Sequence, residues 1–191
     1  MPPRKHQQLL TAAIEREAEA HRRLVAGNLE AARAEFAAAG DLYRQSWEAA
    51  HARAFGRLVG MLKSAVLAGG GLYEARYART ALGERDPDSS TASYAQALAA
   101  LILGEDQDAR LWAARMSADE AFVRTGEAIS ALAAHDEVTY SAALEAIVRS
   151  FERRSRHLTG VAIADTALML EALADRRGIR AAIVSPVLPV R

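Results

Sequence analysis

The segment Gly27-Asn28-Leu29-Glu30-Ala31-Ala32 forms a turn between two stretches in which apolar residues follow a helical period. Comparable turns occur at Gly69-Gly70, Leu103-Gly104-Glu105-Asp106 and Ala134-His135-Asp136, at successive intervals of 42, 35 and 31 residues. Between the turns, apolar side chains recur at positions i, i+3, i+4 and i+7, and the alternation typical of strands is nearly absent. The sequence therefore predicts an all-α protein built from helical hairpins.

The spacing of the turns resembles that of helical-hairpin repeats, whose periods are roughly 34 to 47 residues. Residues 27–32 in particular look like the turn of a tetratricopeptide repeat (TPR). We expect about 8–9 helices in a degenerate TPR-like array, a right-handed stack of four hairpins and a final helix. A compact α/α bundle is the alternative. Residues 1–191 are expected to form a single helical domain, and a subdivision near the loop at residues 83–90 stays open.

The boundaries of the central helices are open to two interpretations. Gly40-Asp41 can end a helix that starts at Leu29, since glycine tolerates a C-terminal cap and aspartate an N-terminal cap. A long helix over Leu42–Ala68 would then follow, with Tyr43, Trp47 and Leu58 on its inner face. The alternative is one unbroken helix from Leu29 onward.

The C-terminal region is expected to be a last helix over Val161–Arg177 followed by an extended tail at residues 179–191. Two prolines oppose a helix in the tail. We expect Ile183, Val187 and Leu188 to pack in a groove between the last helices and to cap the end of the array.

Composition excludes several classes of protein. The chain has no cysteine, which rules out disulfides, iron–sulfur clusters and thiolate zinc sites. Acidic and basic residues number 24 each, without the basic excess of a nucleic-acid binder. The N-terminus lacks the apolar core of a secretory signal, and there is no apolar run of ~18 residues to span a membrane. We therefore expect a cytoplasmic protein, and we expect no cofactor.

Four polar residues interrupt the apolar faces of the predicted helices. Glu17 and His21 fall at the centre of the first apolar stripe, His51 falls inward beside Trp47, and Glu48 lies at the edge of that stripe. A converging Glu/His cluster would suit acid–base chemistry or a metal or small-ligand site. In the competing interpretation, Glu17 and His21 form an ordinary i,i+4 pair and His51 is a core residue.

A basic run follows near the end of the chain. Arg149, Arg153 and Arg156 could bind an anion or an acidic partner, but they map to the face opposite the apolar stripe. Glu145 and Glu152 precede Arg149 and Arg156 by four residues, a spacing that is typical of surface ion pairs. A solvated face is the favoured interpretation.

The C-terminal residues resemble a known family. An Ala- and Leu-rich helix ends in Asp175-Arg176-Arg177-Gly178 and leads to Ser185-Pro186-Val187-Leu188-Pro189. This arrangement is similar to the C-terminal quarter of a helical family of immunity proteins from bacterial polymorphic-toxin systems. The resemblance implies a non-catalytic protein that binds and neutralises a cognate toxin, and it carries over no catalytic residue.

The sequence contains no recognisable catalytic motif. We therefore expect a non-enzymatic module that binds another protein, because helical arrays offer concave surfaces to partners. A structural homodimer is a further possibility, and neither nucleic acid nor membrane is expected as a partner. The alternative function is a metal- or small-ligand-binding bundle that uses Glu17, His21, Glu48 and His51.

Overall fold

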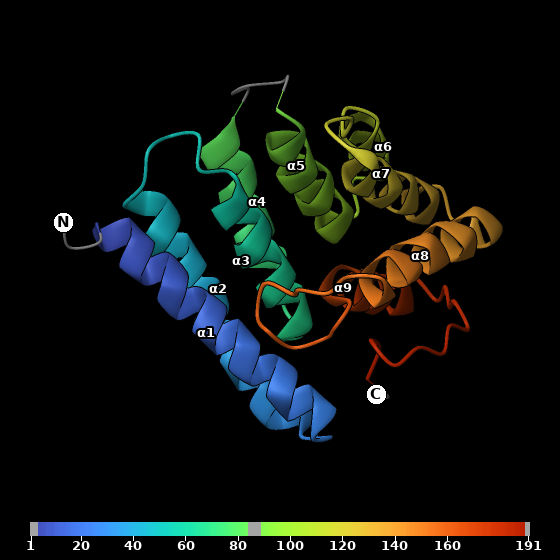
Figure 1. Ribbon diagram of the computed structural model, residues 1–191. Coiled ribbons are helices and arrows are strands. Elements are labelled where there is room, and N and C mark those ends of the chain that lie inside the picture. Colours follow the sequence, from blue (N-terminus) through green and yellow to red (C-terminus); the bar gives the residue numbers. More distant parts are fainter. Residues whose placement is uncertain (1–3, 84–88, 190–191) are drawn as a thin grey trace.

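Helices account for nearly all the regular structure of the protein. The computed structural model describes residues 4–83 and 89–189, and within these ranges it contains nine α-helices and no strand (Figure 1). The predicted all-α fold is thereby confirmed. The sequence leaves a subdivision of the domain open near the loop at residues 83–90, and residues 84–88 of that loop lie outside the described ranges. The helices are α1 (Lys5–Val25), α2 (Leu29–Glu48), α3 (Gly56–Leu67), α4 (Leu72–Leu82), α5 (Ser90–Leu103), α6 (Asp106–Ala113), α7 (Glu120–Ala133), α8 (Glu137–Glu152) and α9 (Asp165–Asp175).

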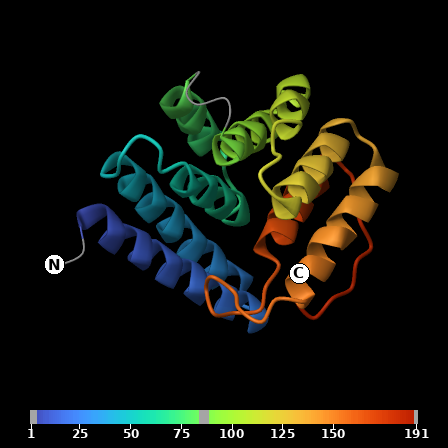
Figure 2. The same cartoon turned by 45° about the horizontal axis from the view of Figure 1, so that its top comes forward.

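The helices stack as a row of hairpins. Each helix from α1 to α8 packs against the next one, and α3 also contacts α5, as α5 contacts α7. The later hairpins therefore also meet through their first helices, α3, α5 and α7, whereas the first hairpin meets the second through α2 and α3. The row curves from α1 round to α8 (Figure 2). The last helix, α9, leaves the row and packs against α3, α7 and α8. This return of the chain brings α9 back to the middle of the molecule.

Two of the turns share one local design. Gly27 has a φ of 75° and precedes Asn28, whose side chain accepts a hydrogen bond from the backbone of Ala31 at the start of α2. His135 adopts a φ of 55° in the same place before Asp136, which caps α8 in the same way. A left-handed residue followed by an N-cap reverses the chain and satisfies free N–H groups of the new helix.

The predicted boundaries at Gly40 and at Leu42–Ala68 are wrong. Helix α2 runs through Gly40 to Glu48, and the chain breaks at residues 49–55 before α3 begins. Gly40 is buried where α3 passes close, since an added Cβ would lie 3.6 Å from the carbonyl oxygen of Met61. The glycine therefore serves helix packing and not helix termination. The break follows from packing that overrides helix propensity, because it lets Phe55 bury its ring beside Trp47.

The connection between α8 and α9 also differs from the prediction. Helix α8 ends at Glu152, and α9 begins at Asp165 and not at Val161. Residues 153–164 form an irregular connection that reaches back toward α1 and α3, drawn in orange in Figure 1. The connection carries Leu158, which is 74% exposed, and it places His157 and Thr159 near the centre of the molecule.

The tail packs along the last helices. Ile179 and Val187 are buried, and Ile183 and Leu188 lie partly buried against the same core. The backbone N–H of Ala164 donates to the carbonyl oxygen of Val187 over 2.9 Å. Through this hydrogen bond, the tail holds Ala164, the residue before α9, in place. Within the described residues, no helix combines the length and the apolar character needed to cross a membrane.

The two glycines of Gly56-x-x-x-Gly60 provide a matched test of this packing. A Cβ on Gly60 would lie 2.8 Å from the ring of Tyr43, whereas a Cβ on Gly56 would meet no heavy atom within 4 Å. We expect Gly60→Ala to lower the free energy of unfolding by about 1–3 kcal/mol, because the buried ring must move. Gly56→Ala should cause no loss. Urea unfolding followed by circular dichroism measures both, and equal effects would contradict the packing described for α2 and α3.

Candidate functional site

An ion pair between α3 and α9 lies at the centre of the candidate site. The Nζ atom of Lys63 donates to Oδ2 of Asp165, and the two side chains are 13% and 17% exposed. Burial by itself would lower the pKa of Lys63, but the nearby Asp165 carboxylate outweighs it and holds that pKa above its ordinary value. Burial likewise opposes ionisation of Asp165, and Lys63 reverses this, so the pKa of Asp165 is lowered. Both groups are therefore charged at neutral pH.

A second polar pair joins α1 to α2 beside this ion pair. The hydroxyl of Tyr43 donates to Oε2 of Glu17 over 2.7 Å, and Glu17 is only 3% exposed. Burial raises the pKa of Glu17, and the negative charge of Asp165 adds to this, whereas Lys63 and the Tyr43 hydroxyl oppose it. The pKa of Tyr43 is raised, first by burial and then by Glu17. The Tyr43 hydroxyl therefore stays protonated and donates a hydrogen bond to the Glu17 carboxyl group.

His21 lies one turn further along α1. Its Nδ1 is 2.9 Å from Oγ1 of Thr159, and its ring packs edge-on against Phe36. Thr159 Oγ1 also accepts the backbone N–H of Val161, which favours an arrangement in which the hydroxyl donates to Nδ1 and Nε2 carries the hydrogen. The Nε2 atom is buried without a hydrogen-bond partner. Burial lowers the pKa of His21 to about 4, so the ring is neutral at pH 7.

Two cavities flank the ion pair. An inner cavity of about 260 Å³ lies between α5, α7, α8 and the 153–164 connection, and an outer cavity of about 680 Å³ lies between α1, α2 and the start of α3. Lys63, Asp165 and Leu158 line both of them. His21 faces the inner cavity, and Glu17 with Tyr43 faces the outer one. The ion pair thus forms part of the wall between the two.

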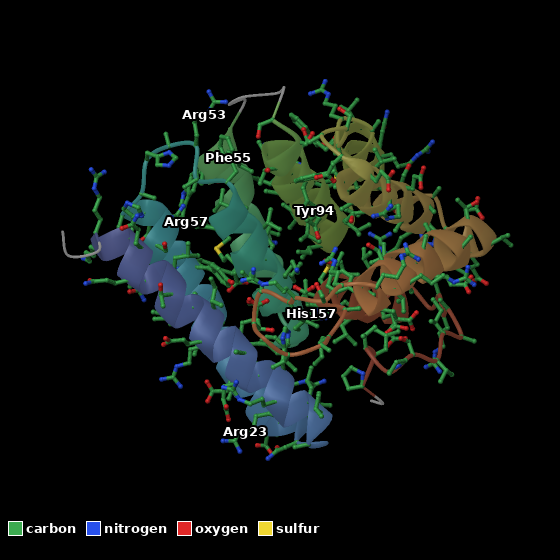
Figure 3. All side chains as sticks on the ribbon, in the orientation of Figure 1. Arg23, Arg53, Phe55, Arg57, Tyr94 and His157 are labelled. Carbon is green, nitrogen blue, oxygen red and sulfur yellow. The ribbon has the colours of Figure 1, made fainter. Side chains whose placement is uncertain are left out.

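The labelled side chains in Figure 3 show the two sides of this arrangement. Tyr94 on α5 and His157 on the connection lie toward the middle of the molecule, and both line the inner cavity. Arg53, Phe55 and Arg57 gather near the start of α3, where they line the outer cavity. Arg57 donates from Nε to Ser46 over 2.7 Å. The site therefore draws on side chains from most of the chain.

The structure separates the four residues of the predicted Glu/His cluster. Glu17 and His21 are buried as the helical pattern predicts, yet each bonds to another segment and they form no i,i+4 pair with one another. Glu48 is exposed and accepts hydrogen bonds from Arg44 and from the Tyr77 hydroxyl.

The inward position predicted for His51 is wrong. His51 lies exposed on the 49–55 break, at the edge of the outer cavity, because the helix that would have turned it inward ends at Glu48. Over residues 4–83 and 89–189, no group of three or more His, Asp or Glu side chains is placed to hold a metal ion.

The three candidate arginines do not form a common site. Arg149 pairs with Glu145 over 2.6 Å on the surface of α8. Arg153 and Arg156 are exposed, and Glu152 accepts a hydrogen bond from Ser185. Arg154, between them, is exposed as well, but it lines the inner cavity because α8 ends at Glu152 and the connection changes direction there.

Two central residues, Lys63 and Asp165, were not among the candidates predicted from sequence. A signal for Lys63 was present: only 2 of the 24 basic residues are lysines, and this one interrupts the apolar run Leu58–Leu67. Asp165 could be read as an ordinary first-turn acid of the last helix. Their pairing depends on the return of α9 to α3, which no local pattern encodes.

Comparison with known proteins returned no relative: no family model, no curated protein and no solved structure matches this chain.

The buried imidazole of His21 makes stability depend on pH. Its pKa is about 4 in the folded protein and about 6.5 in the unfolded chain, so the unfolded chain binds the extra proton first. The contribution of the neutral His21 ring to the free energy of unfolding is fully present above pH 6.5. It declines by up to about 3 kcal/mol as the pH falls toward 4. His21→Gln should remove most of this decline between pH 7.5 and pH 5 in urea unfolding experiments.

His51→Gln is the matched control, because His51 is exposed. It should retain the pH dependence of the unchanged protein. A His21→Gln variant that loses stability with falling pH as steeply as the unchanged protein would show that His21 is not the buried group responsible. Glu17 acts in the opposite sense above pH 4.5, but its contribution is common to both variants.

Proposed function

We propose that this protein binds a small organic molecule reversibly in the inner cavity beside Lys63 and Asp165. The observation that carries the proposal is the convergence of polar side chains from α1, α3, α5, α7, α9 and the 153–164 connection on one cavity at the edge of the apolar core. Concave sites with apolar walls, a few converging polar groups and shifted pKa values are the usual form of a ligand pocket.

The energetics of the ion pair support this proposal. Removing two charges from water is costly, and apolar residues of similar volume often stabilise a core as well or better. Lys63 and Asp165 stand beside a core that is supplied mainly by aliphatic and aromatic side chains. Stability alone therefore does not explain a charged pair at this position. The binding of a ligand with polar groups would explain it.

The walls of the inner cavity suit a ligand with an apolar body. Phe122, Ile147, Phe151 and Ile163 supply apolar surface, and the Phe122 ring stands edge-on to Tyr94 at a centroid distance of 6.3 Å. A cavity of about 260 Å³ is near the lower end of the usual range for ligand pockets, roughly 300–1,000 Å³. A single aromatic ring with one or two polar substituents is the appropriate size class.

Filling the cavity tests the proposal directly. Ala121 at the start of α7 and Ala114 at the end of α6 are both exposed, but only Ala121 lines the inner cavity. We expect ligand-observed NMR to detect weak binding of fragments from a mixture of aromatic acids, amides and amines. Ala121→Trp should abolish that binding by occupying the space, and Ala114→Trp should leave it unchanged. Binding that survives Ala121→Trp, or a complete lack of binding, would contradict the proposal.

A protein partner is the second candidate function, in keeping with the toxin-immunity resemblance. Val25 and Leu29 flank the first turn and are 65% and 41% exposed, next to a separate cavity lined by Leu24 and Phe36. Exposed aliphatic side chains that lie close together are typical of docking surfaces. The product of the neighbouring gene is the partner to test: complex formation should survive Ala121→Trp and be lost with Val25→Asp. A complex lost with Ala121→Trp alone would contradict docking at this turn.

A further inference from the structure

The charges around the inner cavity do not balance. Three cationic side chains line it, Lys63, Arg124 and Arg154, against the single carboxylate of Asp165. Asp165 is committed to Lys63 through their direct contact. The two arginines therefore supply the net charge of the cavity, and that charge is positive.

The first of these arginines has only a weak acidic partner. Arg124 lies 3.1 Å from the carboxylate of Glu120, one turn earlier on α7, and its other terminal nitrogen donates to the Ser150 hydroxyl over 3.3 Å. The Glu120 side chain is 91% exposed, so water and salt screen its charge strongly. Arg124 itself is 24% exposed, so Glu120 neutralises only part of its positive charge at the cavity.

The second arginine has an aromatic partner in place of an acidic one. The guanidinium of Arg154 lies 3.7 Å from the centroid of the Phe151 ring, which holds the planar group against one wall of the cavity. The neighbouring acid, Glu152, accepts a hydrogen bond from Ser185 on the tail. Within the described residues, no ion pair joins Arg154 to a carboxylate. Its five N–H donors are suited to a carboxylate or phosphate group.

Two histidines, His21 and His157, also line this cavity, and each has one buried ring nitrogen without a partner. His21 Nε2 and His157 Nδ1 are both buried without a hydrogen-bond partner, and both rings line the inner cavity. A buried polar atom without a partner is costly, and most such atoms are bonded to protein or to a ligand. With Thr159 donating to Nδ1, the ring hydrogen of His21 lies on this buried Nε2 atom.

We propose that the ligand of the inner cavity is an organic anion, a carboxylate or phosphate ester on an aromatic or similarly apolar body. Arg154 and Arg124 bind the anionic group, and the body lies against Phe122, Phe151 and Ile163. This inference rests on the proposed ligand-binding function, and it specifies the charge of the ligand.

Four probes of similar size isolate the charge. Benzoate and phenyl phosphate are anionic, benzamide is neutral and benzylamine is cationic, and each titration is followed by NMR at low ionic strength. We expect both anions to bind, benzamide to bind at least about tenfold more weakly, and benzylamine not to bind. Added salt should weaken the binding of the anions.

Arg154→Gln should weaken the binding of benzoate about tenfold or more, since it removes a charge-assisted contact. Arg153→Gln is the matched control, because Arg153 is the adjacent arginine and is exposed like Arg154, but lines none of the cavity. Circular dichroism of both variants verifies that they are folded. Equal effects of the two substitutions would overturn the assignment of Arg154.

The results separate the charge of the ligand from the existence of a site. If benzamide or benzylamine binds as tightly as benzoate, and Ala121→Trp abolishes that binding, the anion inference is wrong and the ligand-binding function stands. If none of the four probes binds, the anion inference is overturned, and the screen of the wider fragment mixture against Ala121→Trp decides the proposed function independently.

Discussion

The arrangement of this molecule depends on the contact between Lys63 and Asp165. The two residues are 102 positions apart in sequence, and their ion pair joins the third helix to the first residue of the last one. A charge that leaves water must find its counter-charge, so this contact fixes where α9 can lie. The position of α9 in turn determines the course of the 153–164 connection and of the tail whose Val187 carbonyl receives the N–H of Ala164. Both cavities take part of their wall from this contact.

The other polar groups in the interior are arranged around the pair. Glu17 and Tyr43 satisfy one another on the outer side, and His21 with Thr159 does so on the inner side. The His21–Thr159 contact joins α1 to the 153–164 connection, two segments that the hairpin stacking alone would leave independent. A polar interior of this kind limits the alternative packings of an alanine-rich array, in which many small side chains could slide past one another. The same arrangement leaves donors at the inner cavity, and the proposed function depends on these.

The sequence predicted what local periodicity controls. The all-α class, the hairpin turns capped by Asn28 and Asp136 and the burial of Glu17 and His21 follow from spacing and cap chemistry, which act over a few residues. It did not predict what distant contacts control. Gly40 has the local pattern of a helix stop, yet its role is to admit α3, and the break at 49–55 has no Gly or Pro before Gly56. His51 is exposed on that break, and Arg154 lines the inner cavity because α8 ends at Glu152. Lys63 and Asp165 lie together only because α9 packs against α3.

The most direct test of this account is a double-mutant cycle on the ion pair, with Lys63→Met, Asp165→Asn and the combined variant measured by urea unfolding. Each single change leaves a largely buried charge without its partner and should cost about 3–5 kcal/mol. The combined variant should cost less than the two singles together by at least about 2 kcal/mol. The same cycle on the exposed pair Arg149–Glu145 should give a coupling below about 1 kcal/mol. Additive effects at Lys63 and Asp165, no larger in coupling than those at the exposed pair, would contradict the central role of this contact.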